Sequence, residues 1–139
     1  MAGKIIADTL ETGFGADIAT NYVVFGSAKS WVNFNGVGTV AIRQDGNVSS
    51  ITDNGVGSYT VNFTSNLTDA NYAMTASASR YSVANSYGGM NVLLARNHDS
   101  GSGTAPTSSA CALNVRSGSS HVTAGNLKDT YDVMCSFAR

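Results

Sequence analysis

Apolar and polar residues alternate along short segments of this chain, and this period of two restricts the fold more than any other feature of the sequence. Within residues 58–64, Tyr59, Val61 and Phe63 are separated by polar residues. Successive side chains of a β-strand point to opposite faces of a sheet, so the pattern is typical of a half-buried antiparallel strand. The alternation predicts strands over residues 31–34, 39–43, 48–52, 58–64, 71–79, 90–96, 110–116 and 131–138. No segment has a convincing helical period, so an all-β chain is expected.

Turn sequences rich in glycine and asparagine separate these predicted strands. Asn-Gly-Val-Gly occurs at residues 35–38 and again at residues 54–57, and Asp-Gly at residues 45–46 lies between two further strands. Asn and Gly readily adopt the positive φ that tight hairpin loops require. Short strands joined in this way predict an antiparallel β-sandwich or jelly-roll-like head over residues 30–139.

One face of each predicted strand is apolar, and we expect these faces to form the core. The expected inward-facing residues are Val32, Phe34, Val40, Ile42, Tyr59, Val61, Phe63, Tyr72, Met74, Ala76, Ala78, Cys111, Leu113, Val115, Tyr131, Val133, Cys135 and Phe137. The two cysteines lack metal-ligand spacing and lie within apolar alternation, so buried thiols are expected. A single disulfide is the alternative, if their two strands are neighbours.

Residues 1–29 precede the first strong strand and combine glycines with scattered apolar residues. We interpret them as an N-terminal extended arm for oligomerisation or docking, because such a segment cannot bury its own apolar side chains. Trp31 falls on the strand face opposite to Val32 and Phe34, so it is expected to contact the arm or another subunit. The predicted oligomer interface comprises Ile5, Leu10, Ile18, Tyr22, Val23, Phe25 and Trp31.

Charged residues are scarce, at 12% of the chain with a net charge of -1. The eight Lys and Arg residues are scattered, whereas nucleic-acid binding needs a concentrated positive surface. No run approaches the ~20 apolar residues of a membrane span, and the first residues lack the apolar run of a signal peptide. We therefore expect no nucleic-acid partner, no membrane insertion and synthesis in a cytoplasm.

No catalytic or metal-binding pattern stands out. His98 and His121 both lie beside loop residues, and serine is too frequent here for a catalytic triad to be recognised by spacing. The nine acidic residues lie mostly in turns or in the arm, whereas a glycosidase needs two carboxylates that face each other across a sugar. We expect no enzyme activity, no cofactor and no metal.

Two tyrosines in the polar stretch of residues 80–89 suggest a glycan contact. Exposed tyrosine rings can stack on sugar rings while polar neighbours bind the hydroxyl groups. A polar loop over residues 97–109 follows. The predicted receptor or glycan contact comprises Tyr81, Tyr87, Asn97, His98 and Asp99. The alternative is that the tyrosines pack on their own domain.

Residues 28–43 (AKSWVNFNGVGTVAIR) and 47–63 (NVSSITDNGVGSYTVNF) resemble the C-terminal domains of tail fibres and other virion appendage proteins of tailed phages. The likeness covers roughly residues 28–80 and extends more loosely to Phe137. The opening residues 1–10 also resemble the start of short virion proteins that contain this module. The resemblance implies a homotrimer with a β-rich head, located in the virion, and many such proteins contact host polysaccharide or protein.

The residues and the resemblance together predict a non-enzymatic virion structural protein that forms a homotrimeric fibre tip, tail or head appendage. Its arm is expected to bind sibling subunits or other virion proteins. A lectin-like host-receptor module that binds glycan is the alternative. A polysaccharide depolymerase is the least supported function, because the sequence shows no paired carboxylates of the required kind.

Overall fold

A computed structural model of the chain describes residues 7–11, 13, 15, 17–79, 105–116 and 127–139. Its elements, in order, are β1 (Thr9–Glu11), β2 (Asp17–Ala19), α1 (Thr20–Gly26), β3 (Ala28–Asn35), β4 (Ala41–Gly46), β5 (Val48–Gly55), β6 (Ser58–Phe63), β7 (Ala73–Ala78), β8 (Ala110–Asn114) and β9 (Val133–Ala138). Every pair of neighbouring strands is antiparallel. The expected all-β antiparallel fold is confirmed, while the choice between sandwich and jelly roll stays a prediction. Among the described residues, no helix has the length and apolar content needed to cross a membrane.

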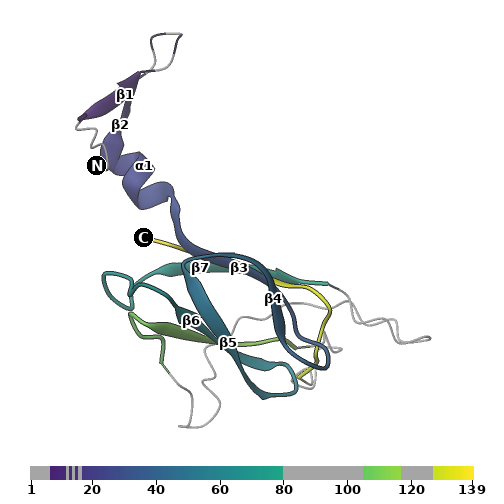
Figure 1. Cartoon of the computed structure of the whole chain (residues 1–139). Helices are drawn as coiled ribbons and strands as arrows, with labels where there is room; N and C mark the ends of the chain where they lie inside the picture. Colours follow the sequence, from purple (N-terminus) through teal and green to yellow (C-terminus); the bar gives the residue numbers. More distant parts are fainter. Residues whose placement is uncertain (1–6, 12, 14, 16, 80–104, 117–126) are drawn as a thin grey trace, which may run out of the picture.

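Two sheets form the head and share one core (Figure 1). The strand order is β4-β3-β9-β7 in one sheet and β5-β6-β8 in the other. Phe34 meets Tyr59 edge-on with ring centroids 5.1 Å apart, and Phe63 meets Phe137 in the same way at 5.0 Å. Both contacts join a residue of one sheet to a residue of the other. The apolar faces of the two sheets are therefore buried against each other.

The predicted core is confirmed at most positions. The buried apolar residues are Val32, Phe34, Val48, Tyr59, Val61, Phe63, Leu67, Cys111, Leu113, Val115, Val133, Cys135 and Phe137, with Val40, Ile42, Tyr72, Met74, Ala76 and Ala78 half-buried against them. Tyr131 is a wrong prediction, because its side chain is 58% exposed. The strand β9 begins only at Val133, so the alternation does not reach Tyr131. The strand predicted over residues 90–96 lies outside the described residues.

A polar contact ties the turn after β3 to the start of β6 and to the segment before β9. The hydroxyl of Tyr59 lies 2.9 Å from the carbonyl oxygen of Gly36 and 2.8 Å from Oδ1 of Asp129. The same carboxylate oxygen accepts a hydrogen bond of 2.7 Å from the backbone N–H of Gly57. Burial raises the pKa of Tyr59 well above its usual value, and the Asp129 carboxylate raises it further. The tyrosine therefore stays protonated, and its one O–H group is shared between the Gly36 carbonyl and the Asp129 carboxylate.

The described part of the arm is not extended throughout, which corrects the prediction for residues 1–29. Strands β1 and β2 form a hairpin, and the seven-residue helix α1 follows it directly. The backbone N–H and the hydroxyl of Thr20 both donate to the Asp8 carbonyl, which fixes the start of the helix against the chain before β1. No residue of α1 is buried. Seven residues are too few to show a helical period in the sequence, so periodicity could not reveal this helix.

Two glycines with positive φ provide a matched test of the fold. Gly38 has φ +67° with open space around it, whereas Gly57 has φ +62° and lies against backbone. A Cβ at Gly57 would lie 2.6 Å from the Val115 carbonyl oxygen and would collide with the backbone nitrogen of Lys128. We expect Gly38→Ala to lower the free energy of unfolding by about 1–2 kcal/mol, the left-handed backbone penalty. Gly57→Ala should add roughly 1–3 kcal/mol of overpacking. Urea denaturation of both variants measures the difference, and equal losses would contradict this packing.

Candidate functional site

One face of the four-stranded head sheet points away from the core. The register pairs Trp31 of β3 with Ser136 of β9, and Asn33 with Met134. It also pairs Met134 with Ser77 of β7. Because side chains alternate across a strand, these residues share the face opposite to the buried Val32 and Cys135. Trp31 and Met134 on this face are among the exposed large apolar residues of the described chain.

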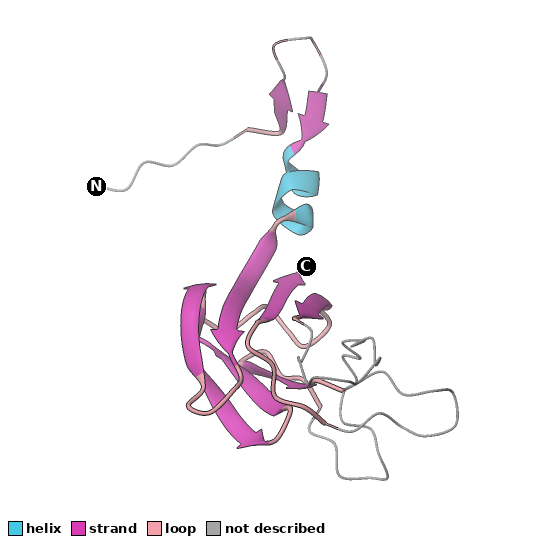
Figure 2. Ribbon diagram, turned by 90° about the vertical axis from the view of Figure 1, so that its right-hand side faces the viewer, coloured by secondary structure: helices cyan, strands magenta, loops and turns pink. Residues whose placement is uncertain are grey.

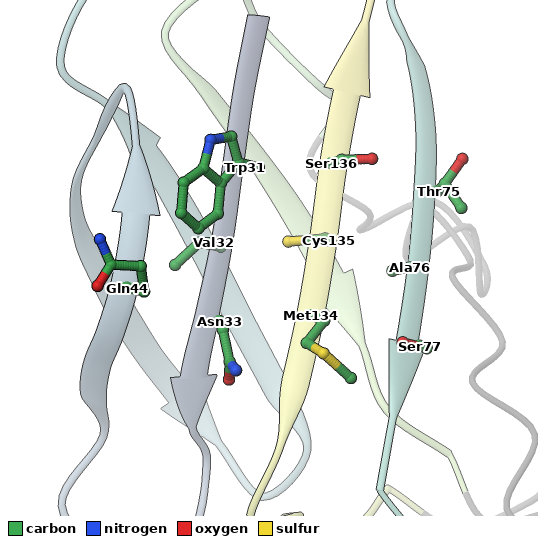
Figure 3. A pocket seen from close by; sticks show the side chains of 10 residues that line it. All are labelled: Trp31, Val32, Asn33, Gln44, Thr75, Ala76, Ser77, Met134, Cys135 and Ser136. Carbon is green, nitrogen blue, oxygen red and sulfur yellow. The ribbon is translucent and has the colours of Figure 1, made fainter. Parts of the chain in front are cut away.

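A shallow hollow of about 440 Å³ lies on this outer face (Figure 3). It is lined by Trp31, Val32, Asn33, Gln44, Thr75, Ala76, Ser77, Met134, Cys135 and Ser136. Trp31 and Met134 are the large apolar side chains in it, and they are 40% and 42% exposed. The other outward-facing side chains are amides and hydroxyls, and none of the lining residues is charged. The hollow can therefore bind an apolar, uncharged group, with polar partners at its rim.

The position of Trp31 depends on the glycine beside it. Trp31 pairs with Gly46 on β4, and a Cβ at Gly46 would collide with the indole Nε1. The missing side chain lets the indole lie against the neighbouring strand. Figure 3 shows the ring broadside, extending from β3 toward β4 and Gln44. The ring therefore presents a broad apolar surface that the sheet holds in place.

The arm exposes the second apolar surface of the described chain. Tyr22 is 72% exposed and Phe25 is 64% exposed, and both lie on α1. Figure 2 shows the arm leaving the head as a continuation of β3. The other exposed apolar residues of the arm are Leu10, Ile18, Val23 and Val24. The structure thus places the predicted interface residues Leu10, Ile18, Tyr22, Val23 and Phe25 on one projecting segment, and Ile5 lies outside the described residues.

Two apolar residues of these surfaces were not predicted from the sequence. Val24 lies between two predicted interface residues, so the apolar run of residues 22–25 was the available signal. Met134 interrupts the expected alternation of β9 with an apolar residue on the outward face. An apolar residue at an outward position of β9 was the available signal in the sequence.

The predicted glycan contact lies outside the described residues. Tyr81, Tyr87, Asn97, His98 and Asp99 all belong to the undescribed range 80–104. Their assignment stays a prediction, and the structure neither groups nor separates them.

Several acidic groups of the described residues have structural partners. Arg43 pairs with Asp132 at 2.5 Å, and Arg139 pairs with Asp69. Within the described ranges, no group of three or more His, Cys, Asp or Glu side chains could hold a metal ion.

The two cysteine thiols face each other's sheet across the core and form no disulfide. Burial raises the pKa of the Cys135 thiol to about 12, and the nearby Cys111 adds to the shift. Cys111 lies 3.7 Å from the sulfur of Met74. The buried thiols expected from the sequence are confirmed, and both are core packing groups with little nucleophilic character.

Comparison with family models, with curated proteins and with solved structures found no similar protein.

The buried thiols lead to a prediction about reactivity. Because only the thiolate attacks a disulfide reagent, a cysteine with a raised pKa should react slowly near neutral pH. We expect neither Cys111 nor Cys135 to react with Ellman's reagent at pH 8 in the folded protein, and both to react at once in 6 M guanidinium. Absorbance at 412 nm measures the reaction. Rapid labelling of a folded, unheated sample would contradict the burial of these side chains.

Proposed function

We propose that this chain is a non-enzymatic structural subunit of a tailed-phage virion that assembles as a homotrimeric appendage at a fibre tip, tail or head. The observation that supports self-association best is the exposed arm, whose helix has no buried residue. The resemblance over residues 28–80 supports the virion assignment and the number of copies. The arm is also the segment that we expect to contact other virion proteins.

The energetics of the arm favour association. Burying a Phe or Val side chain contributes about 1.5–3 kcal/mol relative to leaving it in water. Helix α1 exposes Tyr22, Val23, Val24 and Phe25, so covering them contributes several such increments. The loss of translational and rotational freedom costs roughly 4–15 kcal/mol. Contacts made by several arms can offset that cost. Association would also stabilise α1, because a helix of seven residues alone in water is only marginally stable.

Low charge is compatible with close packing of identical copies. Residues 20–26 contain no Asp, Glu, Lys or Arg, so arms brought together near one axis do not repel one another. The head needs no partner to close its core, because both sheets already bury their apolar faces on each other. Association therefore connects complete heads through their arms.

Contact with a host surface is the alternative function. Assembly into an oligomer would make weak sites useful, because linked sites raise avidity by roughly 10²–10⁴-fold without new contacts. The residues predicted for glycan contact lie outside the described structure, so the oligomeric structural role is the better supported of the two. A glycan array probed with the assembled protein separates them, and strong selective binding would favour the alternative.

Charges placed on the arm should disrupt assembly. We expect the double variant Tyr22→Asp/Phe25→Asp to shift the protein from oligomer to monomer at micromolar concentration, because it adds charge to a surface that is buried between copies. Light scattering after size-exclusion chromatography gives the mass. The control is Val56→Asp, an apolar residue that is 59% exposed at the turn between β5 and β6.

The control should keep the oligomeric mass, and circular dichroism should show an unchanged β spectrum for both proteins. A double variant with the same mass as the unmodified chain would exclude the arm as the assembly surface.

The virion assignment has a separate test. Immunogold labelling of purified parent particles with an antibody against this chain should place the label at a tail or head appendage. A chain that lacks residues 1–26 should keep its β fold but should not be incorporated into particles, because the arm connects the head to its neighbours. The antibody should then give no label on the particles. Normal incorporation of the truncated chain, or absence of this protein from purified particles, would overturn the proposal.

A further inference from the structure

We propose that the hollow on the outer face of the sheet β4-β3-β9-β7 receives helix α1 of a second copy of this chain. The inference rests on the proposed self-association and names the surface that the arm contacts. Two apolar surfaces of the same chain are exposed in the described residues, the hollow around Trp31 and Met134 and the helix with Tyr22 and Phe25. A single contact between copies covers both.

Charge supports the pairing of these two surfaces. None of the residues that line the hollow is charged, and α1 contains no charged residue either. Apolar groups of the two surfaces would meet, and the amide groups of Asn33 and Gln44 can donate to the hydroxyl of Tyr22. The Asn33 side-chain oxygen already accepts from Arg43, whose charge is paired with Asp132. No charge is left buried without a partner on either side.

The dimensions of the two surfaces also agree. A helix of seven residues is about 10 Å long, because each residue adds about 1.5 Å. Neighbouring strands lie roughly 4.8 Å apart, so the distance from β3 across β9 to β7 is also about 10 Å. Trp31 and Ser77 lie on the first and last of these three strands. Helix α1 can therefore lie across the hollow from one side to the other.

The geometry of the arm excludes its own hollow as the target. The backbone N–H of Ser27 donates to the Val23 carbonyl, and the Lys29 ammonium group donates to the Val24 carbonyl and to the Ser27 hydroxyl. These bonds hold α1 in line with β3, and Figure 2 shows the arm continuing beyond the end of that strand. Folding α1 back over Trp31 would need a chain reversal at Gly26 and Ser27, which would break the bonds that Lys29 makes to Val24 and Ser27. The helix can reach the hollow only on another copy.

This contact is heterologous, because the arm of one copy meets a different surface on the next. A heterologous contact either closes into a ring or continues as an open fibre. In a ring of three, each arm lies on the neighbouring head, so every arm and every hollow is covered. This arrangement agrees with the proposed homotrimer.

Thiol crosslinking of the full chain tests the inference. The double variant Val24→Cys/Ser77→Cys places one thiol on α1 and one at the hollow. With a short bismaleimide we expect covalent dimers and trimers on a denaturing gel. The two native cysteines should stay unlabelled because they are buried. Each single variant, and the control pair Val24→Cys/Ser49→Cys with its second thiol on an exposed position of the other sheet, should remain at the mass of one chain.

Trp31 supplies a second readout, because it is the only tryptophan of the chain. If α1 of a neighbour covers the indole, Phe25→Asp should shift its fluorescence emission to longer wavelength, and Val56→Asp should leave the emission unchanged. This measurement detects the contact even where crosslinking geometry is unfavourable.

The remaining outcomes separate the inference from the proposed function. Crosslinking of the single variant Val24→Cys would show that arms pack on one another, and would overturn the inference. An oligomer by light scattering with neither crosslinking nor an emission shift would overturn the inference and leave the proposed function standing. A monomer by light scattering would overturn both. A last outcome concerns glycan binding, with maltohexaose as the saccharide probe. If the Trp31 emission maximum shifts when maltohexaose is added but not in Phe25→Asp, the hollow binds saccharide and the inference is overturned.

Discussion

The rest of the structure depends on the burial of two apolar sheet faces against each other. Edge-on contacts such as Phe34 with Tyr59 and Phe63 with Phe137 connect the sheets at both ends of the core. Strands β6 and β9 bury every second residue in this layer, and most of their outward residues are polar. The buried hydroxyl of Tyr59 also bonds to Asp129, which fixes the segment before β9. The head thus completes its core with residues that all lie beyond the arm.

The core of the head is formed without the apolar residues of the arm or of the outer face. The arm nevertheless exposes a run of large side chains at residues 22–25, and β3 and β9 place Trp31 and Met134 on the outer face. Burial of apolar surface is the main favourable contribution to association. The arm and the outer face are therefore the two places in the described chain where contact with another copy gains the most. Both lie on or directly beside β3, which links the arm to the head.

Much of the fold could be predicted from alternation alone, because a period of two fixes which side chains share a face. Val32, Phe34 and Val61 follow this rule and are buried. Tyr131 does not, because the pattern continues in the sequence beyond the point where β9 begins. Helix α1 was missed because seven residues are too few to show a helical period, so no local signal separated it from an extended segment. The arm surface could be predicted from its unmatched apolar residues, whereas the hollow required the register that brings β3, β9 and β7 together.

The central claim is that the apolar side chains of the arm stay exposed to water in a single chain and are covered only when copies associate. Sedimentation equilibrium of the unmodified protein over a range of micromolar concentrations tests this claim most directly. The account predicts one species with three times the 14.3 kDa mass of the chain. A mass of one chain throughout that range would show that the exposed arm is stable in water by itself, and would contradict the account.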